Sequence, residues 1–285
     1  MASGQSFLNT IKNMLKTSIK LFLGVSILFI FIFFTIFGLL FYKVDPKEPK
    51  FASLHPPSLE NPLGTDILGR DILAQLIYGT AYSLKIGVLA ALIASAIGII
   101  VGGVGGYLGG IVDDILTLIT NTLLTIPSIA LLVVIAAYFR VRSEWILILI
   151  IGITSWPSMA RSIRSQVLSL KSRDFIELAK LLGLSKSRIL FVEVLPNMLS
   201  YIVMYFFLNI AGAIVSEAAL SVIGLGPTAT ISLGILLRWA IAWDSIRCGA
   251  WWWFLFPGLA ITIISVSLFL INDGLDQLYN PRARG

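Results

Sequence analysis

The sequence has little charge and almost none of the residues that build metal and redox sites. Of its 285 residues only 13% are charged and 57% are hydrophobic, whereas soluble domains carry about 25% charged residues. It has one cysteine, Cys248, and one histidine, His55, which lies in a proline-containing stretch. This composition excludes a soluble domain, an internal disulfide, a thiolate metal cluster and a metal site built on two histidines.

The signatures of a self-contained ATPase or hydrolase are also missing. No Gly-Lys dipeptide occurs, so the chain lacks a phosphate-binding loop that ends in Gly-Lys-Ser/Thr. The glycines within residues 61–71 and 102–110 match neither that loop nor a dinucleotide-binding fingerprint. The net charge of +6 comes from basic residues scattered between apolar runs, which is not the footprint of a nucleic-acid-binding surface. We therefore expect no catalytic residue, metal or cofactor in this chain, and no nucleic-acid partner.

The sequence is instead rich in long apolar runs, which predict an all-α polytopic membrane protein with six transmembrane helices. A helix crosses the bilayer core with about 20 apolar residues. The predicted spans are residues 21–42, 86–106, 115–139, 145–159, 198–223 and 254–271. The first is too long to be the apolar region of a cleaved signal peptide, and Pro127 predicts a kink in the third. Gly98, Gly102 and Gly106 recur every four residues in the second, which predicts close packing against another helix.

The distribution of charge predicts the orientation of these spans. An even number of spans places both termini on one side, together with the charged loop at residues 161–197. That side holds twelve Lys and Arg and the other side nine, and the outer segment 43–85 balances its bases with five acids. Because cytoplasmic loops carry an excess of Lys and Arg, we predict that both termini and the charged loop are cytoplasmic.

Three consecutive tryptophans, Trp251, Trp252 and Trp253, precede the sixth predicted span. They would lie where that span meets the outer membrane surface, a boundary that tryptophan prefers. We favour an interfacial anchor in the membrane lipid, and a sugar-stacking platform is the alternative.

Glu217 is the only acid well inside a predicted span. A buried acid in a membrane helix is costly and is a functional candidate for that reason. It would be the titrating group of a proton-coupled carrier, but such carriers usually need several groups of this kind. We favour a hydrogen bond that fixes two helices near the outer side.

The charged loop contains a short amphipathic helix. Its apolar residues have the spacing of one helix face, and they are Phe175, Leu178, Ala179 and Leu182. Asp174 and Glu177 near its start and Lys180 near its end suit the helix dipole, and Gly183 can take the left-handed conformation that ends a helix. Such a helix can lie in lipid headgroups. We favour docking on a protein, because the helix is short and its small residues permit close approach of another backbone.

The same stretch resembles the "EAA" coupling loop of bacterial and archaeal ABC importer permeases. The similar residues are Glu177-x-Ala179, Gly183 six residues after the glutamate, and Leu195-Pro196-Asn197. Leu178 stands where the motif usually has alanine, and Glu193 where it has an apolar residue or histidine. In that family the loop forms a helix that docks in a cleft of the ATPase subunit. The resemblance implies six ATPase-docking residues: Asp174, Glu177, Leu178, Ala179, Leu182 and Gly183.

Similarity over nearly the whole chain points to the C-type permease of dipeptide/oligopeptide ABC importers. The similar stretches are Asn61–Asp71, Tyr107–Gly110, Glu217–Ser221 with Gly224–Gly226, Phe256–Gly258, Asn272–Gly274 and Asn280–Arg282. The resemblance implies a tail, first helix and extracellular segment at residues 1–80 and the importer transmembrane domain at 81–285, with its coupling loop at 161–197.

The resemblance also implies the assembly and the activity. The partners would be a B-type permease in a heterodimer, two ABC ATPase subunits that bind ATP and Mg, and an extracellular solute-binding protein. The assembly would import di- or oligopeptides across the cytoplasmic membrane by alternating access. Cello- or xylo-type oligosaccharides and nickel complexes are alternative cargoes, and a proton-coupled carrier and a scaffold without transport activity are more distant alternatives.

Overall fold

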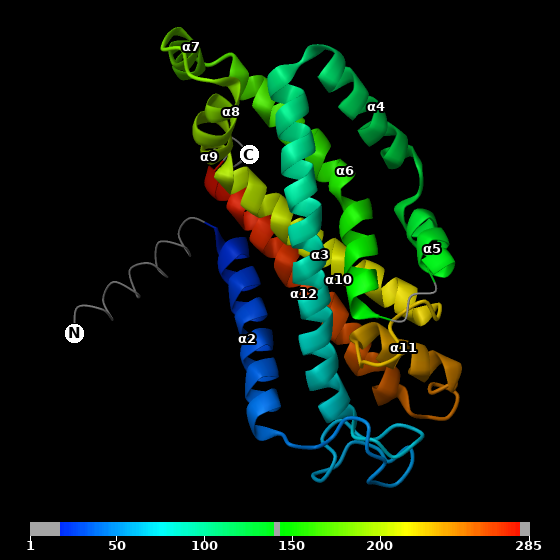
Figure 1. Cartoon of the computed structure of the whole chain (residues 1–285). Coiled ribbons are helices and arrows are strands. Elements are labelled where there is room, and N and C mark those ends of the chain that lie inside the picture. Colours follow the sequence, from blue (N-terminus) through cyan, green and yellow to red (C-terminus); the bar gives the residue numbers. More distant parts are fainter. Residues whose placement is uncertain (1–17, 140–142, 280–285) are drawn as a thin grey trace, which may run out of the picture.

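The computed structural model describes residues 18–139 and 143–279, and these residues contain helices and no strand (Figure 1). The elements are α2 (Ile19–Phe41), α3 (Ile72–Leu108), α4 (Gly110–Thr125), α5 (Ser128–Phe139), α6 (Glu144–Lys171), α7 (Asp174–Leu181), α8 (Lys186–Arg188), a π-helix η1 (Ile189–Val194), α9 (Leu195–Asn197), α10 (Leu199–Val222), α11 (Leu233–Ala242) and α12 (Trp251–Tyr279). The N-terminal tail and the Asn280–Arg282 stretch lie outside the described residues.

Five of these helices are long and apolar enough to cross a membrane, and α4 with α5 makes a sixth span if this bent pair is counted as one. The prediction of an all-α polytopic membrane protein is therefore confirmed. The third predicted span is broken by 88° rather than gently kinked. The break lies at Pro127, which has no N–H to donate, and Ile126 before it has an extended backbone.

Three predicted boundaries are wrong, because the helices continue past the apolar runs, and one of them is the end of α12, which lies at Tyr279 rather than at residue 271. The second span begins at Ile72 rather than at residue 86, and Asp71 caps it by accepting a hydrogen bond from the backbone N–H of Ala74 at 2.7 Å. Consequently residue 80, taken as the end of the first segment, lies within α3. The fourth span continues to Lys171, so the first part of the predicted loop 161–197 is helical.

The glycine stripe of α3 packs against α6, as its spacing predicts. A Cβ atom added at Gly102 would lie 2.3 Å from the carbonyl oxygen of Ala160 on α6. One added at Gly98 or Gly106 would lie 3.0 Å from other atoms of α6. Only glycine permits the two helices to come this close. The close approach allows dispersion contacts between their backbones.

Gly102→Ala is expected to destabilise the protein, whereas Gly103→Ala is not. At position 102 the methyl group would force α3 and α6 apart, and such overpacking costs about 1–3 kcal/mol. At position 103 the nearest atoms are 3.7 Å from an added Cβ, which is ordinary contact. Thermal unfolding of the two purified variants measures the difference, and equal melting temperatures would contradict this account of the stripe.

The first helix, α2, is held to the bundle through α12. A Cβ atom at Gly274 of α12 would lie 2.4 Å from the backbone nitrogen of Leu21, so the two helices meet without side chains between them. Lys20 and Asp273 form an ion pair across the contact at 2.5 Å. The Asn272–Gly274 stretch therefore acts in helix packing.

The connection between α2 and α3 is an ordered cap at one end of the bundle, opposite α7 and α8 (Figure 1). Asp66 is fully buried and accepts hydrogen bonds from the Arg70 guanidinium at 2.6 Å and the Gln75 amide at 2.9 Å. Asn61 donates to Asp71 at 2.9 Å. The polar residues of the 61–71 stretch thus satisfy one another's hydrogen-bonding groups and those of the backbone at the start of α3.

This cap changes the interpretation of the tryptophan run. Trp253 is fully buried and Trp252 is 6% exposed, because both pack among Ile72 and Ala240 beneath the cap. The indole N–H of Trp252 donates to the carbonyl oxygen of Thr65 at 3.2 Å. The prediction of an interfacial anchor is wrong for these two residues. Trp251 is exposed, so for this residue the interfacial anchor stays a prediction.

Candidate coupling and translocation sites

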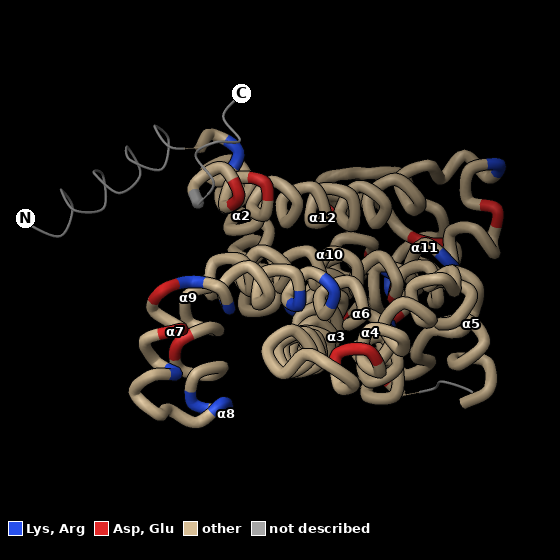
Figure 2. Tube along the Cα trace, turned by 90° about the horizontal axis from the view of Figure 1, so that it is seen from above, with Lys and Arg blue, Asp and Glu red and all other residues tan. Residues whose placement is uncertain are grey.

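The amphipathic helix of the charged loop forms as α7, at one end of the bundle (Figure 1). Figure 2 shows that charged positions are frequent on α7 and α8 and sparse within the bundle. The helix ends as its sequence predicts. Gly183 has a φ of +74°, and the Leu184 N–H donates back to the Ala179 carbonyl oxygen at 3.2 Å. This is the hydrogen-bond pattern of a Schellman motif.

The apolar residues of α7 divide between two faces. Ile176 and Ala179 are buried against Ile189 and Val194 of η1. The expectation that Ala179 faces a partner is therefore wrong for its side chain, which is covered by the chain itself. Sequence spacing alone did not identify Ile176 as the residue that joins α7 to the rest of the loop.

The other face of α7 is apolar and exposed. Leu178 is 58% exposed, Leu182 70% and Phe175 39%. Asp174 and Glu177 are exposed on the same helix, and nothing in the described residues lies within 4 Å of a Cβ added at Gly183. A short helix with an exposed apolar face can dock into a groove of another protein through anchors at i, i+3 or i+4, and i+7.

A polar pocket of about 460 Å³ lies where the third span breaks. It is bounded by the turn between α4 and α5 and by faces of α6 and α10. Its polar lining residues are Thr125, Ser128, Thr154, Ser155, Ser158, Asn209 and Ser216. Gly212 lies in the same wall, and a Cβ added there meets no described atom within 4 Å. Uncharged hydroxyl and amide groups of this kind can hydrogen-bond a polar solute without holding it by charge.

Glu217 of α10 is fully buried and joins three helices. One carboxylate oxygen accepts from the Ser221 and Ser232 hydroxyls at 2.7 and 2.6 Å, and the other accepts from the Ser83 hydroxyl at 3.2 Å. Ser83 belongs to α3 and Ser232 caps α11.

The hydroxyl groups around Glu217 also bind the backbone of α11. Ser83 accepts from the Leu233 N–H at 3.1 Å and Ser232 from the Ile235 N–H at 3.2 Å. Since both hydroxyl oxygens already accept a backbone proton, their own protons are free to point at the carboxylate. The geometry suits a carboxylate that only accepts, and it fixes α11 against α3 and α10.

At the end nearer the charged loop, an ion pair links α4 to α6. The Arg164 guanidinium binds both carboxylate oxygens of Asp113, at 2.5 and 2.7 Å. Arg161 donates to the Asn121 amide oxygen at 2.7 Å one turn away. A bidentate pair of this type is both strong and directional. The two residues lie 51 positions apart, so no local pattern in the sequence points to this pair.

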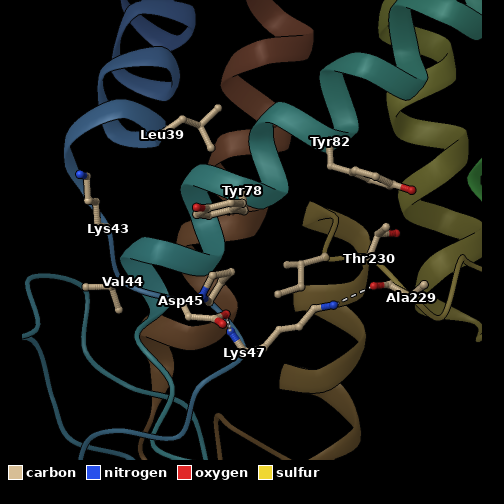
Figure 3. A pocket seen from close by; sticks show the side chains of 11 residues that line it. Leu39, Lys43, Val44, Asp45, Lys47, Tyr78, Tyr82, Ala229 and Thr230 are labelled. Carbon is tan, nitrogen blue, oxygen red and sulfur yellow. Dashed lines mark hydrogen bonds between the residues drawn. The ribbon is translucent and has the colours of Figure 1, made fainter.

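A second pocket, of about 610 Å³, lies on the capped end of the bundle (Figure 3). Tyr78 and Tyr82 of α3 form one wall, and the segment after α2 forms another. The Lys47 ammonium group donates to the carbonyl oxygen of Ala229 at 2.8 Å, so this segment is tied across the pocket to the stretch before α11. The pocket lies beside α2 rather than at the break between α4 and α5.

Comparisons with known proteins agree with the helical architecture. The profile of the family described as binding-protein-dependent transport system inner membrane component matches residues 94–285. One chain of the MetNI methionine ABC transporter, from a crystal structure of its inward-facing conformations, superposes with a TM-score of 0.56. That match has 20% sequence identity and covers 73% of this chain and 97% of the other. At this identity it supports a similar fold and nothing more.

Two curated relatives are similar over most of the chain. A putative peptide permease protein of Brucella suis biovar 1 (strain 1330) is 32% identical over 228 residues, which cover 80% of this chain and 75% of the relative. The dipeptide transport system permease protein DppC of Bacillus subtilis (strain 168) is 33% identical over 262 residues, which cover 90% of this chain and 81% of the relative.

Proposed function

Because this chain belongs to the family of inner membrane components of binding-protein-dependent transport systems, we propose that it is the C-type permease of an ATP-driven importer of di- or oligopeptides. The observation that carries this proposal is the similarity to a dipeptide permease over 90% of the chain. Oligosaccharides of the cello or xylo type and nickel complexes are the alternative cargoes. The chain would act in the cytoplasmic membrane as a heterodimer with a B-type permease.

The exposed face of α7 is the proposed contact with one of two ABC ATPase subunits, which bind ATP and Mg. Phe175, Leu178 and Leu182 offer three apolar anchors on a helix outside the spans. The excess of Lys and Arg in the charged loop supports a cytoplasmic placement of α7 and of both termini. An extracellular solute-binding protein would deliver the cargo at the opposite end.

The polar pocket at the break of the third span is proposed as one wall of the translocation path. It is the place where α10 presents Asn209, Gly212 and Ser216 along a single face. Neutral hydrogen-bonding groups suit peptide cargo of varied charge, because they favour no sign. The B-type permease would supply the facing wall, and movement of the spans under ATP hydrolysis would expose the pocket alternately to each side.

Uptake into proteoliposomes tests the proposal. The complete complex with its solute-binding protein is expected to accumulate labelled di- or oligopeptides only when ATP is present inside, where the ATPase subunits lie. Labelled cello-oligosaccharides and nickel complexes in parallel samples identify the alternative cargoes. If the chain alone takes up cargo under a proton gradient without ATP, it is a proton-coupled carrier and not an importer subunit. If no cargo is taken up, a scaffold without transport activity is favoured.

Gly212→Trp is expected to block the path without unfolding the protein. An indole at this position would occupy the open pocket, because a Cβ there meets no described atom within 4 Å. Uptake should fall at least about tenfold, as expected for filling a site that must admit a solute, while ATPase subunits still co-purify. Val203→Trp on the same helix, outside the pocket, is the control. Equal uptake by both variants would remove the pocket from the path.

A further inference from the structure

Three lysines meet in a pocket at the end of the bundle nearest α7, and no described ion pair involves them. Lys171 ends α6, Lys180 lies on α7 and Lys186 begins α8. The pocket has a volume of about 380 Å³, and its remaining lining is Tyr107, Leu108, Leu184 and Ile189. No acidic side chain is among the described residues that line it. Three lysines therefore line one hollow whose described lining includes no acid.

The floor of this pocket is formed by the end of α3, where the apolar run of this helix stops. Tyr107 and Leu108 are the last two residues of α3 and directly follow the apolar run that ends at Gly106. The ammonium group of Lys171 lies 5.8 Å from the centre of the Tyr107 ring, in cation–π range. Leu108 is 43% exposed beside them. Positive charge above an aromatic and apolar floor, at the end of a span, suits a molecule with an anionic head and an apolar tail.

The charges around the pocket leave the lysines available. Lys171 acts on the Asp113 carboxylate through its charge, but both oxygens of that carboxylate are already bound by Arg164. Lys180 and Lys186 are exposed. Three lysines around one hollow favour an anionic occupant such as a phosphate group.

We propose that this pocket binds the phosphate headgroup of an anionic phospholipid from the cytoplasmic leaflet. Basic pockets between the cytoplasmic ends of membrane helices bind such headgroups, and each Lys or Arg near the surface adds to the attraction. The lipid would bridge the end of α6 to α7 and α8, and so hold the coupling helix against the bundle. The proposal relies on the cytoplasmic placement of α7 but not on the cargo or on transport itself.

An acidic surface of a partner protein is the competing occupant. The structure favours the lipid, because Phe175, Leu178 and Leu182 of the exposed α7 face are absent from the pocket lining. The pocket is instead lined in part by the ends of two spans, α3 and α6. A partner seated on the exposed face of α7 and a lipid in the pocket are therefore compatible.

Retention of phosphatidylglycerol by the purified complex tests the proposal. Delipidated complex is exchanged into phosphatidylcholine nanodiscs with increasing phosphatidylglycerol, and the bound anionic lipid is counted by native mass spectrometry after release. The triple variant Lys171→Gln, Lys180→Gln, Lys186→Gln is expected to bind phosphatidylglycerol at least about tenfold more weakly. The triple variant Lys43→Gln, Lys47→Gln, Lys50→Gln removes the same charge from the opposite end and should bind as the wild type does.

The remaining outcomes each decide the matter. Three Lys→Arg substitutions at the pocket keep the charge and should restore binding. If both triple Gln variants lose phosphatidylglycerol binding equally, or if neither loses it, the proposed site is wrong. Inorganic phosphate at 10 mM and constant ionic strength would displace the lipid if the pocket binds free phosphate with a dissociation constant on the order of millimolar. Such displacement would assign the pocket to free phosphate. Loss of the ATPase subunits with unchanged lipid binding would assign it to the partner protein. These lipid-binding measurements require no transport. A negative result would therefore overturn the lipid site without bearing on the proposed transport function.

Discussion

Glu217→Leu is expected to unfold the capped end of the bundle, with a fall in melting temperature of at least about 5 °C. The leucine removes the acceptor for three hydroxyl groups, from Ser83, Ser221 and Ser232, and these lie in a site that water does not reach. Hydrogen bonds inside membrane proteins contribute about 0.6–1.7 kcal/mol each, so three amount to about 2–5 kcal/mol. Thermal unfolding of the complex, followed by loss of soluble protein, measures the effect.

Glu217→Gln separates a structural role from a titrating one. The amide oxygen can still accept from Ser221 and Ser232, so only the link to Ser83 is altered. The expected destabilisation is about 1 kcal/mol, and ATP-driven uptake should persist. A Gln variant with the wild-type melting temperature and no uptake would show instead that Glu217 must gain and lose a proton. Ser221→Ala removes one of the three donors and is expected to cost about 0.6–1.7 kcal/mol, less than Glu217→Leu.

The second large effect is expected at α7, the proposed contact with the ATPase subunit. Leu178→Asp with Leu182→Asp places two charges on the exposed apolar face of α7, while both positions are open to solvent in the free chain. Central apolar anchors of an interface contribute at least about 2 kcal/mol each, so their loss should weaken ATPase binding by roughly a hundredfold or more. Cargo-stimulated ATP hydrolysis should disappear together with co-purification of the ATPase subunits, and the melting temperature of the isolated chain should not change.

Two further variants make the coupling test specific. Val192→Asp adds a charge at an exposed position of η1 and should leave ATPase binding near the wild-type level. Ile176→Asp lies on the buried face of α7 and should lower the stability of the charged loop itself. If the Leu178/Leu182 variant kept full ATPase binding, the exposed face of α7 would not be the docking surface.

A bulky residue at Gly183 is a less selective way to block docking. The open space around this glycine would admit the side chain of Gly183→Trp, which should obstruct a partner. However, the φ of +74° lies in the left-handed region, where an L side chain is strained. A loss of ATPase binding in this variant would combine an obstructed surface with a distorted helix end, so the leucine variants are the better test.

The sequence by itself determined the features that depend on neighbouring residues. Long apolar runs predicted the spans, because a helix in lipid satisfies its backbone groups within the segment itself. The repeat of Gly98, Gly102 and Gly106 predicted a close helix contact, since glycines four residues apart lie on one face. Gly183 marked the end of α7 because a left-handed residue there completes local hydrogen bonds.

The tertiary structure alone decided which partner each of these features meets. Ala179 has helical spacing with Leu178 and Leu182, yet only the fold of η1 shows that Ala179 faces inward. Trp253 looks like a boundary residue until the segment before α3 covers it. Glu217 finds a hydroxyl group on Ser83, 134 residues earlier in the chain. Periodicity shows which residues share a face, but the burial of that face depends on a segment distant in sequence, and no local pattern encodes that pairing.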